Sequence, residues 1–228
     1  MQRPPQPSIP VPELPSGAAS DVAEDTIELA RRTVRMLRPR NGDAILDELL
    51  SEDDPDEDRL PFWAELWPSG LALAGAIASQ PLTGRRVLEL GCGLGLVSVT
   101  AALAGARVLA VDRSPEATAF TAANAARNGV ALETVVGAFD QPGRWLQEAP
   151  WDLVLAADVL YEQRNVDLLL DLLPRLLDDR GEVWLADPGR SMLPTFLGGV
   201  DVTGWHRDQV PADPDIVTIH RLRRATPD

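Results

Sequence analysis

The chain has 228 residues and a formal net charge of −14, because 35 acidic residues outnumber 21 basic ones, all of them arginine. Contacts to nucleic-acid phosphates need a positive surface, so this charge argues against a DNA or RNA substrate. No run approaches the ~18 apolar residues of a membrane span, and the N-terminus lacks the basic-then-apolar order of a signal peptide, so we expect a cytoplasmic protein that contacts no membrane.

The composition also indicates how the chain is divided. With 45% hydrophobic residues it can bury one core of ordinary size. Residues 1–20 are rich in proline and poor in large apolar groups, which predicts a disordered tail. We expect an N-terminal extension over residues 21–60, one α/β domain over residues 61–228, and a monomer. Cys92 is the one cysteine, so an internal disulfide is excluded, and we expect no metal centre.

The extension begins with an ambiguous pattern. Apolar side chains between residues 25 and 38 alternate as in two strands, but their spacing would also allow one apolar face of a helix. We favour a β-hairpin that turns near residues 30–31. A short amphipathic helix is predicted over residues 41–50, and an acidic, solvated loop over residues 51–58.

An aromatic segment follows, over residues 61–70. It holds two of the six tryptophans, Trp63 and Trp67, directly ahead of an apolar helix expected over residues 71–79. The two indoles either pack this helix on the sheet as a hydrophobic staple, or they cover a ligand pocket with aromatic faces that can hold an amine. Both roles stay open.

A strand and a glycine turn occupy residues 86–95, the stretch around which the other elements are arranged. A short apolar run, typical of a strand buried on both faces, stops at glycines on alternate positions: Gly91, Gly93 and Gly95. A helix predicted over residues 97–104 would point its N-terminal amides at whatever lies in the turn. The dinucleotide pattern G-x-G-x-x-G fails, because Leu96 takes the place of its third glycine.

The pattern E-x-G-x-G-x-G over residues 89–95 resembles motif I of the seven-strand (class I) S-adenosylmethionine-dependent methyltransferases. The resemblance implies a Rossmann-like seven-strand α/β sheet, mostly parallel with an antiparallel edge and helices on both faces. It also implies S-adenosyl-L-methionine as the cofactor. The next strand, residues 107–112, ends on a carboxylate suited to the two ribose hydroxyls. The expected cofactor contacts in this region are Glu89, Gly91, Cys92, Gly93, Gly95 and Asp112. The alternative is a glycine turn in an unrelated α/β protein.

The same resemblance places adenine contacts after the third strand, residues 132–136. Ala138 and Phe139 are the candidates for contact with the ring, and Asp140 is the candidate for its amine. Phe139 would fit the core equally well, and Asp140 a turn. Trp67 is a further candidate cofactor contact.

The remaining elements alternate between helices and strands. Ser114 is predicted to cap a helix that stops at residues 128–129. Residues 151–158 form an apolar strand that ends on Asp158, with Tyr161 close behind. Doubly wound sheets bind ligands at the carboxyl ends of their strands, so these two residues are the candidate catalytic groups. We then expect a helix over residues 165–177, a strand over 181–187, and an antiparallel edge pair over 203–207 and 216–221.

Three further motifs narrow the resemblance. They are D-x-x-Y at residues 158–161, FWAELWPSG at 62–70 and ADPGR at 186–190, and they are similar to the methyltransferases of the electron-transfer flavoprotein β-subunit. This implies N-methylation of an accessible lysine in a protein, with the flavoprotein subunit or a ribosomal protein as the target. Asp158 would hold the lysine ammonium and orient the amine, Tyr161 would lend an oxygen or a ring face, and Trp63 would line the substrate pocket. The alternative for Asp158 is a cap on the following helix.

Two other functions stay open. A small-molecule N-methyltransferase acting on a pyridine or an amine metabolite would use the same fold, with Trp63 and Trp67 stacked on its substrate. A non-catalytic S-adenosylmethionine-binding partner subunit would keep the glycine turn and Asp112 without turnover. His206 and His220 lie apart from every motif, and we expect structural or surface roles for both.

Overall fold

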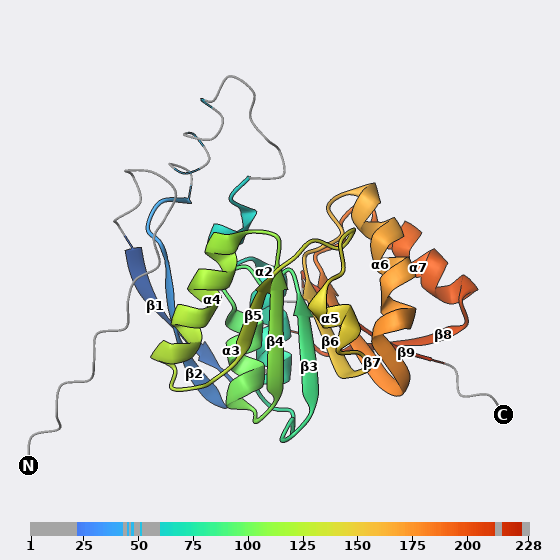
Figure 1. Ribbon diagram of the computed structural model, residues 1–228, viewed down its shortest axis with the longest axis horizontal. Helices are drawn as coiled ribbons and strands as arrows, with labels where there is room; N and C mark the ends of the chain where they lie inside the picture. Colours follow the sequence, from blue (N-terminus) through green and yellow to red (C-terminus); the bar gives the residue numbers. More distant parts are fainter. Residues whose placement is uncertain are drawn as a thin grey trace, which may run out of the picture.

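Seven strands form one mixed sheet in the order β5-β4-β3-β6-β7-β9-β8 (Figure 1). The computed structural model describes residues 22–42, 45, 47, 51, 60–212 and 216–224. The first five strands in this order pair in parallel, β9 is antiparallel to β7, and β8 is antiparallel to β9. The Rossmann-like sheet with an antiparallel edge is thereby confirmed. The strands are β3 (Arg86–Leu90), β4 (Arg107–Asp112), β5 (Glu133–Val136), β6 (Trp151–Ala157), β7 (Leu177–Asp187), β8 (Trp205–Val210) and β9 (Thr218–Arg224).

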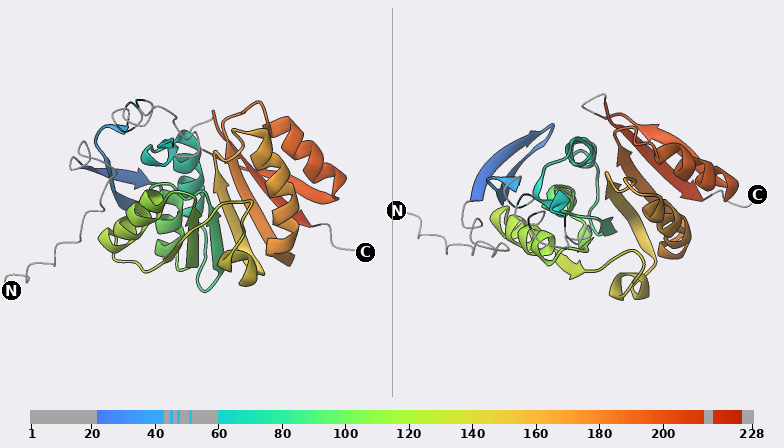
Figure 2. Two further views of the ribbon diagram at one scale, coloured as in Figure 1. Left: turned by 45° about the horizontal axis from the view of Figure 1, so that its top comes forward. Right: turned by 90° about the horizontal axis from the view of Figure 1, so that it is seen from above.

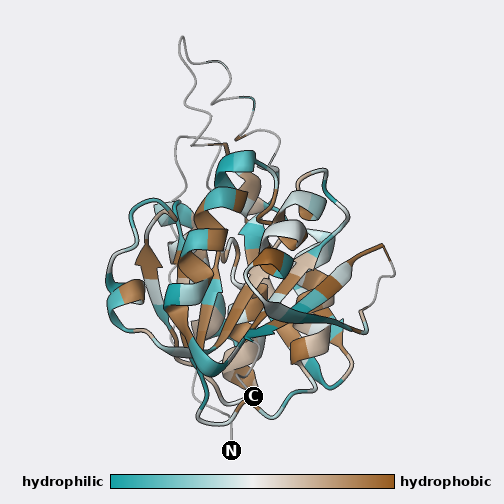
Figure 3. Cartoon of the chain, turned by 90° about the vertical axis from the view of Figure 1, so that its right-hand side faces the viewer, coloured by the Kyte–Doolittle hydropathy of each residue, from teal (hydrophilic) through white to brown (hydrophobic). Residues whose placement is uncertain are grey.

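Helices cover both faces of this sheet (Figure 2). α2 (Pro68–Ile77), α3 (Leu96–Leu103) and α4 (Pro115–Arg127) bury one apolar cluster, and α6 (Gln163–Leu176) and α7 (Leu193–Val202) bury the other. The central strands serve both clusters, because successive side chains of a strand point to opposite faces. Val87 belongs to the first cluster and Leu88 to the second. Figure 3 shows the resulting apolar strands between helices with hydrophilic outer surfaces. Within the described residues, no helix has the length and apolarity to cross a membrane.

The N-terminal hairpin confirms the alternating pattern. β1 (Val22–Leu29) pairs antiparallel with β2 (Arg32–Pro39), and the turn falls at residues 30–31. Asn124 of α4 fixes the hairpin to the domain. Its Oδ1 accepts from Leu37 N at 2.6 Å, and its Nδ2 donates to Leu37 O at 3.0 Å and to Leu94 O at 2.9 Å. One buried amide thus ties the hairpin to the glycine turn. The predicted tail lies outside the described residues, as do most of the predicted helix 41–50 and nearly all of the acidic loop.

The last part of the chain differs from expectation in one helix and in strand boundaries. The sequence pattern does not predict α7, because proline and two glycines near Phe196 obscure its helical periodicity. Burial of Phe196 and Val200 in the second cluster holds this helix in place. The edge strands exist as an antiparallel pair, but each begins two residues later than predicted. β8 starts late because α7 runs to Val202 and residues 203–204 form the turn after it. His206 on β8 is exposed and His220 on β9 is buried, in keeping with their predicted structural or surface roles.

Candidate functional site

A cavity of about 640 Å³ opens at the carboxyl ends of the parallel strands. It lies where a doubly wound sheet binds its ligands. The residues predicted for the site come from several separate strand ends and from the aromatic segment, and all of them line this cavity: Trp63, Trp67, Glu89, Gly91, Cys92, Gly93, Gly95, Asp112, Ala138, Phe139, Asp140, Asp158 and Tyr161. The fold therefore brings together every residue that the sequence predicts for the site.

The glycine turn forms one wall of the cavity. Gly91 N and Cys92 N both donate to Val111 O of β4, at 2.9 and 3.0 Å, so the turn is fixed to the neighbouring strand. Gly91, Gly93 and Gly95 have φ values of 72°, 51° and 83°, in the region that side chains with a Cβ rarely adopt. α3 begins at the next residue, and its first residues, Leu96 and Val97, line the cavity, so the N-terminal end of this helix lies beside it.

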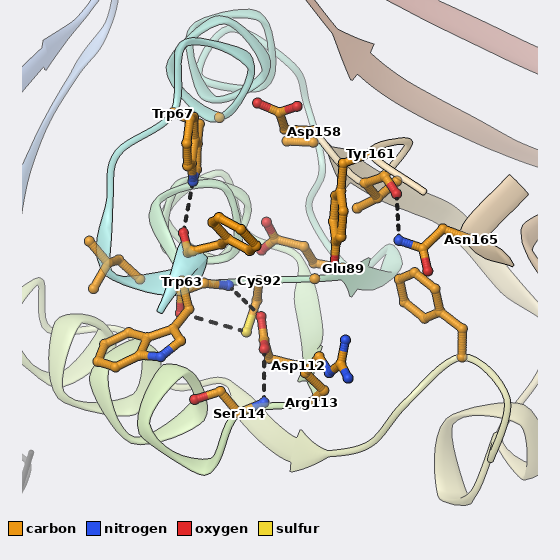
Figure 4. Close-up of a pocket in the computed structure, with 18 of the residues that line it drawn as sticks. Trp63, Trp67, Glu89, Cys92, Asp112, Arg113, Ser114, Asp158, Tyr161 and Asn165 are labelled. Atoms are coloured by element: carbon orange, nitrogen blue, oxygen red, sulfur yellow. Dashed lines mark hydrogen bonds between the residues drawn. The ribbon is translucent and has the colours of Figure 1, made fainter. Parts of the chain in front are cut away.

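Asp112 ends β4 beside this turn, and both of its oxygens accept backbone hydrogen bonds (Figure 4). Gly93 N donates to Oδ2 at 2.8 Å and Ser114 N donates to Oδ1 at 3.0 Å. Burial raises the pKa of the Asp112 carboxyl, and the two amides oppose that rise. A carboxylate has about four lone-pair sites, so one that is held by backbone amides can still accept from a hydroxyl. Ser114 in turn caps α4, as predicted, by accepting from Ala117 N at 3.1 Å.

Cys92 and Glu89 are buried under the same wall. Cys92 Sγ lies 3.4 Å from Thr121 Oγ1, and burial raises the pKa of the thiol, with the neighbouring Asp112 and Glu89 carboxyls adding to the effect. A thiol of raised pKa stays protonated and is a poor nucleophile, so Cys92 fits the role of a small turn residue. Burial also raises the pKa of Glu89, to about 8, although Ser98 Oγ donates to its carboxylate.

The raised pKa of Glu89 predicts a pH-dependent stability. Between the ordinary value of 4.5 and about 8, the folded protein holds a proton on Glu89 that the unfolded chain has released. The free energy of unfolding should therefore fall as the pH rises through this window, by about 5 kcal/mol at most. In Glu89→Gln, which cannot ionise, this part of the slope should vanish in urea unfolding measured at pH 5, 6.5 and 8. Parallel pH profiles for the two proteins would contradict the prediction.

The predicted adenine side of the cavity is formed by the loop after β5. Ala138, Phe139 and Asp140 all line the cavity there, and Phe139 also packs against the second apolar cluster. The Asp140 carboxylate forms an ion pair with Arg164 of α6, a partner that no sequence motif indicates. All three residues therefore border the space in which an adenine ring could lie, and contact with adenine stays a prediction.

The two tryptophans of the aromatic segment have separate roles. Trp63, in the short 3₁₀ helix η2 (Phe62–Ala64), is buried, and its ring lies 5.5 Å from that of Phe120 on α4. Figure 4 shows its indole directed away from Tyr161. Trp67 is 38% exposed at the mouth of the cavity, and its Nε1 donates to Phe62 O at 2.8 Å. Trp63 thus packs against α4 and also lines the cavity, Trp67 lies at its mouth, and contact of either indole with a ligand stays a prediction.

Asp158 and Tyr161 lie at the other end of the cavity, beyond β6. Asp158 has a φ of 62°, is buried, and forms an ion pair through Oδ1 with Arg190 Nε. It does not cap α6, since the cap residue of that helix is Glu162 and it makes no side-chain cap bond. The Tyr161 ring is 38% exposed and lies 6.0 Å from the ring of Phe62. The rings of Phe62 and Tyr161 and the buried Asp158 carboxylate therefore lie together at this end of the cavity.

For several residues that line this site, the sequence predicts no role. Phe62 and Arg190 stand inside the motifs FWAELWPSG and ADPGR, but their position in a motif does not say what they touch. Asn165 lines the cavity and its Nδ2 donates to Val159 O at 3.0 Å, which fixes the segment that carries Tyr161 (Figure 4). The motifs mark Phe62 and Arg190 as candidate site residues, but only their contacts in the folded protein indicate what each side chain does.

Residues 61–192 match the family described as lysine methyltransferase. The chain is 34% identical over 140 residues to an electron transfer flavoprotein beta subunit lysine methyltransferase of Xenopus laevis, covering 58% of this chain and 54% of the relative. It is 31% identical over 177 residues to EEF1A lysine methyltransferase 3 of Mus musculus, covering 72% and 74%. The chain spans about half the length of the first curated relatives that it matches. Among solved structures, the N-methyltransferase NodS from Bradyrhizobium japonicum, in complex with S-adenosylhomocysteine, shares the fold with a TM-score of 0.58 at 17% identity, covering 82% of this chain and 100% of NodS.

Proposed function

Because the chain belongs to the lysine methyltransferase family, we propose that it transfers a methyl group from S-adenosylmethionine to the side-chain nitrogen of a lysine in a protein. The observation that carries this proposal is the meeting of two sets of residues in one cavity. The glycine turn and Asp112 form a nucleoside-type cradle, and Asp158 with Tyr161 faces the same space. A carboxylate and aromatic rings suit an alkylammonium group.

The residues present fit the methyl donor. The cavity of about 640 Å³ lies within the usual range for small-molecule sites, roughly 300–1,000 Å³. The glycine turn borders the cavity at Gly91, Gly93 and Gly95, where the backbone carries no side chain that would keep a ligand away. We assign the ribose hydroxyls to Asp112, the methionyl part to residues 89–95, and the adenine to residues 138–140. When bound, S-adenosylmethionine supplies a methyl group already activated on a sulfonium sulfur.

The chain itself then has three tasks. It must align the lysine nitrogen with the methyl group, exclude water, and allow the lysine to lose a proton before attack. The last task arises because the ordinary lysine pKa is about 10.4, so the side chain is an ammonium at neutral pH. Asp158 holds the ammonium and orients it. Tyr161, Phe62 and Trp67 surround the alkyl chain at the mouth, where their rings displace water. A dedicated base is unnecessary, since the proton can leave to solvent before attack.

The proposal is tested by labelling a lysate. The purified chain is incubated with donor radiolabelled on the methyl group and a lysate of its own organism, and one or a few protein bands should become labelled. The chain contains no lysine, so it cannot label itself on that side chain. Label confined to the small-molecule fraction would favour an amine or pyridine metabolite as acceptor. Absence of heat on calorimetric titration with donor would count against enzymatic activity altogether.

A further inference from the structure

Arg190 approaches the acceptor end of the cavity from a separate strand. It follows β7, where Asp187 Oδ1 accepts from Gly189 N and Arg190 N, both at 2.7 Å. Asp187 is 1% exposed, so this turn is anchored in the interior. The backbone of Arg190 is thereby fixed, and its side chain reaches from the end of β7 to the end of the adjacent β6.

The guanidinium of Arg190 lies between the two groups that would meet a lysine ammonium. Its Nε donates to Asp158 Oδ1, and its central carbon lies 6.0 Å from the centre of the Trp67 ring. The Asp158 side chain is 6% exposed and that of Arg190 is 33% exposed. The buried carboxylate that an acceptor would approach thus already has a cation beside it. The ion pair uses Oδ1, and Oδ2 is left for a second donor.

This pairing bears on the proton that the acceptor must lose. An ammonium beside an isolated buried carboxylate is stabilised in its charged form, which raises its pKa and opposes formation of the nucleophile. A guanidinium in a protein stays charged and offsets that field. Resting on the proposed function, we propose that Arg190 is a positioning residue that balances the charge of Asp158 and so favours the neutral form of the acceptor amine. The proton passes from the ammonium to bulk water.

Other ionisable groups line the same cavity and are held differently. Asp140 pairs with Arg164, Glu89 accepts from Ser98, and Asp112 accepts from two backbone amides. The other titratable or charged side chains that line the cavity are Glu65, Cys92, Arg113, Glu116, Tyr161 and Glu162. Asp158 is the group that pairs with Arg190, so substitution of this arginine changes the charge next to the acceptor carboxylate most directly.

The test is the pH profile of Arg190→Gln. Initial rates of label transfer to the protein bands of the lysate are measured from pH 6.5 to 10, in saturating donor. If Arg190 lowers the pKa of the bound amine by one unit, the variant should be about tenfold slower than the native protein near pH 7, and the two rates should converge near pH 10. With the labelled acceptor purified, kcat should fall at neutral pH while KM stays level or falls, because the ammonium binds an unpaired carboxylate more tightly.

Two matched variants separate this role from structural damage. Arg190→Lys keeps a cation and should restore most of the neutral-pH rate. Arg175→Gln removes an exposed arginine that pairs with Asp171 on α6, away from the cavity, and should keep the native profile. Donor binding by calorimetry should be equal in all four proteins. A loss in Arg190→Gln that is constant across the pH range, or a lower KM with an unshifted profile, would overturn the inference. Absence of labelling by the native protein would refute the proposed function itself, and the inference with it.

Discussion

Replacement of Asp158 by asparagine removes one partner of a buried charge pair and is expected to lower kcat/KM for the protein acceptor about 100-fold or more, while the affinity for the methyl donor stays within about twofold. Asp158 is the buried carboxylate at the acceptor end of the cavity, and the amide of asparagine cannot balance an ammonium. The amide oxygen would still accept a hydrogen bond, but Arg190 would then face the ammonium of the incoming lysine without a negatively charged partner. Both the capture and the orientation of the lysine should suffer.

Asparagine is the right replacement because of the backbone at this position. Asp158 has a φ of 62°, a value that asparagine tolerates better than most residues do. Asp171→Asn is the matched control, because it makes the same chemical change on the exposed side of α6, away from the cavity. Transfer is measured with methyl-labelled donor, and donor affinity by calorimetry. A variant that loses transfer and donor affinity together would show that the substitution has disrupted the whole cavity, and unchanged transfer would remove Asp158 from the reaction.

The elements that position the site are predictable from the sequence because each has a local signal. The apolar run of β6 ends on Asp158, and that of β4 ends on Asp112, so both carboxylates can be placed at one edge of a parallel sheet. The glycines of residues 91–95 mark the turn that follows β3. The alternation of apolar and polar side chains likewise favours the hairpin that the structure contains, although the same residues could also form one apolar face of a helix.

The contacts between distant segments have no such signal. Trp63 and Trp67 stand four positions apart, yet one is buried on Phe120 and the other is exposed at the mouth, because the short η2 helix ends between them. Arg190 meets Asp158 across 32 positions of sequence. Such a pairing depends on where two strand ends come together and on the direction of a long side chain, neither of which a local pattern encodes. α7 escapes prediction because its tertiary packing outweighs a weak propensity.

Substitution of Gly95 by alanine should lower the free energy of unfolding by about 3 kcal/mol or more and weaken donor binding at least about tenfold. Gly95 has a φ of 83°, which by itself disfavours a Cβ by about 1–2 kcal/mol. A Cβ there would also lie 2.6 Å from Thr121 Oγ1 and 2.7 Å from Thr121 Cγ2. Thr121 cannot move away easily, because it is fully buried on α4 and its Oγ1 donates to Gly93 O at 3.0 Å. Either the hydrogen bond breaks or the turn shifts, and a shifted turn alters the wall that would face the donor.

The two contributions can be separated with Gly84, which also has a positive φ, of 77°. Beyond its chain neighbours, a Cβ at Gly84 would meet no atom of the described residues within 4 Å. Gly84→Ala should therefore lower the free energy of unfolding by the conformational part alone, about 1–2 kcal/mol, and leave donor affinity unchanged. Urea unfolding and calorimetric titration of both variants give the comparison. The excess effect in Gly95→Ala measures the close approach of α4 to the glycine turn. Equal destabilisation in the two variants would mean that Thr121 yields freely, and a native donor affinity in Gly95→Ala would mean that the methyl donor does not rest on this turn.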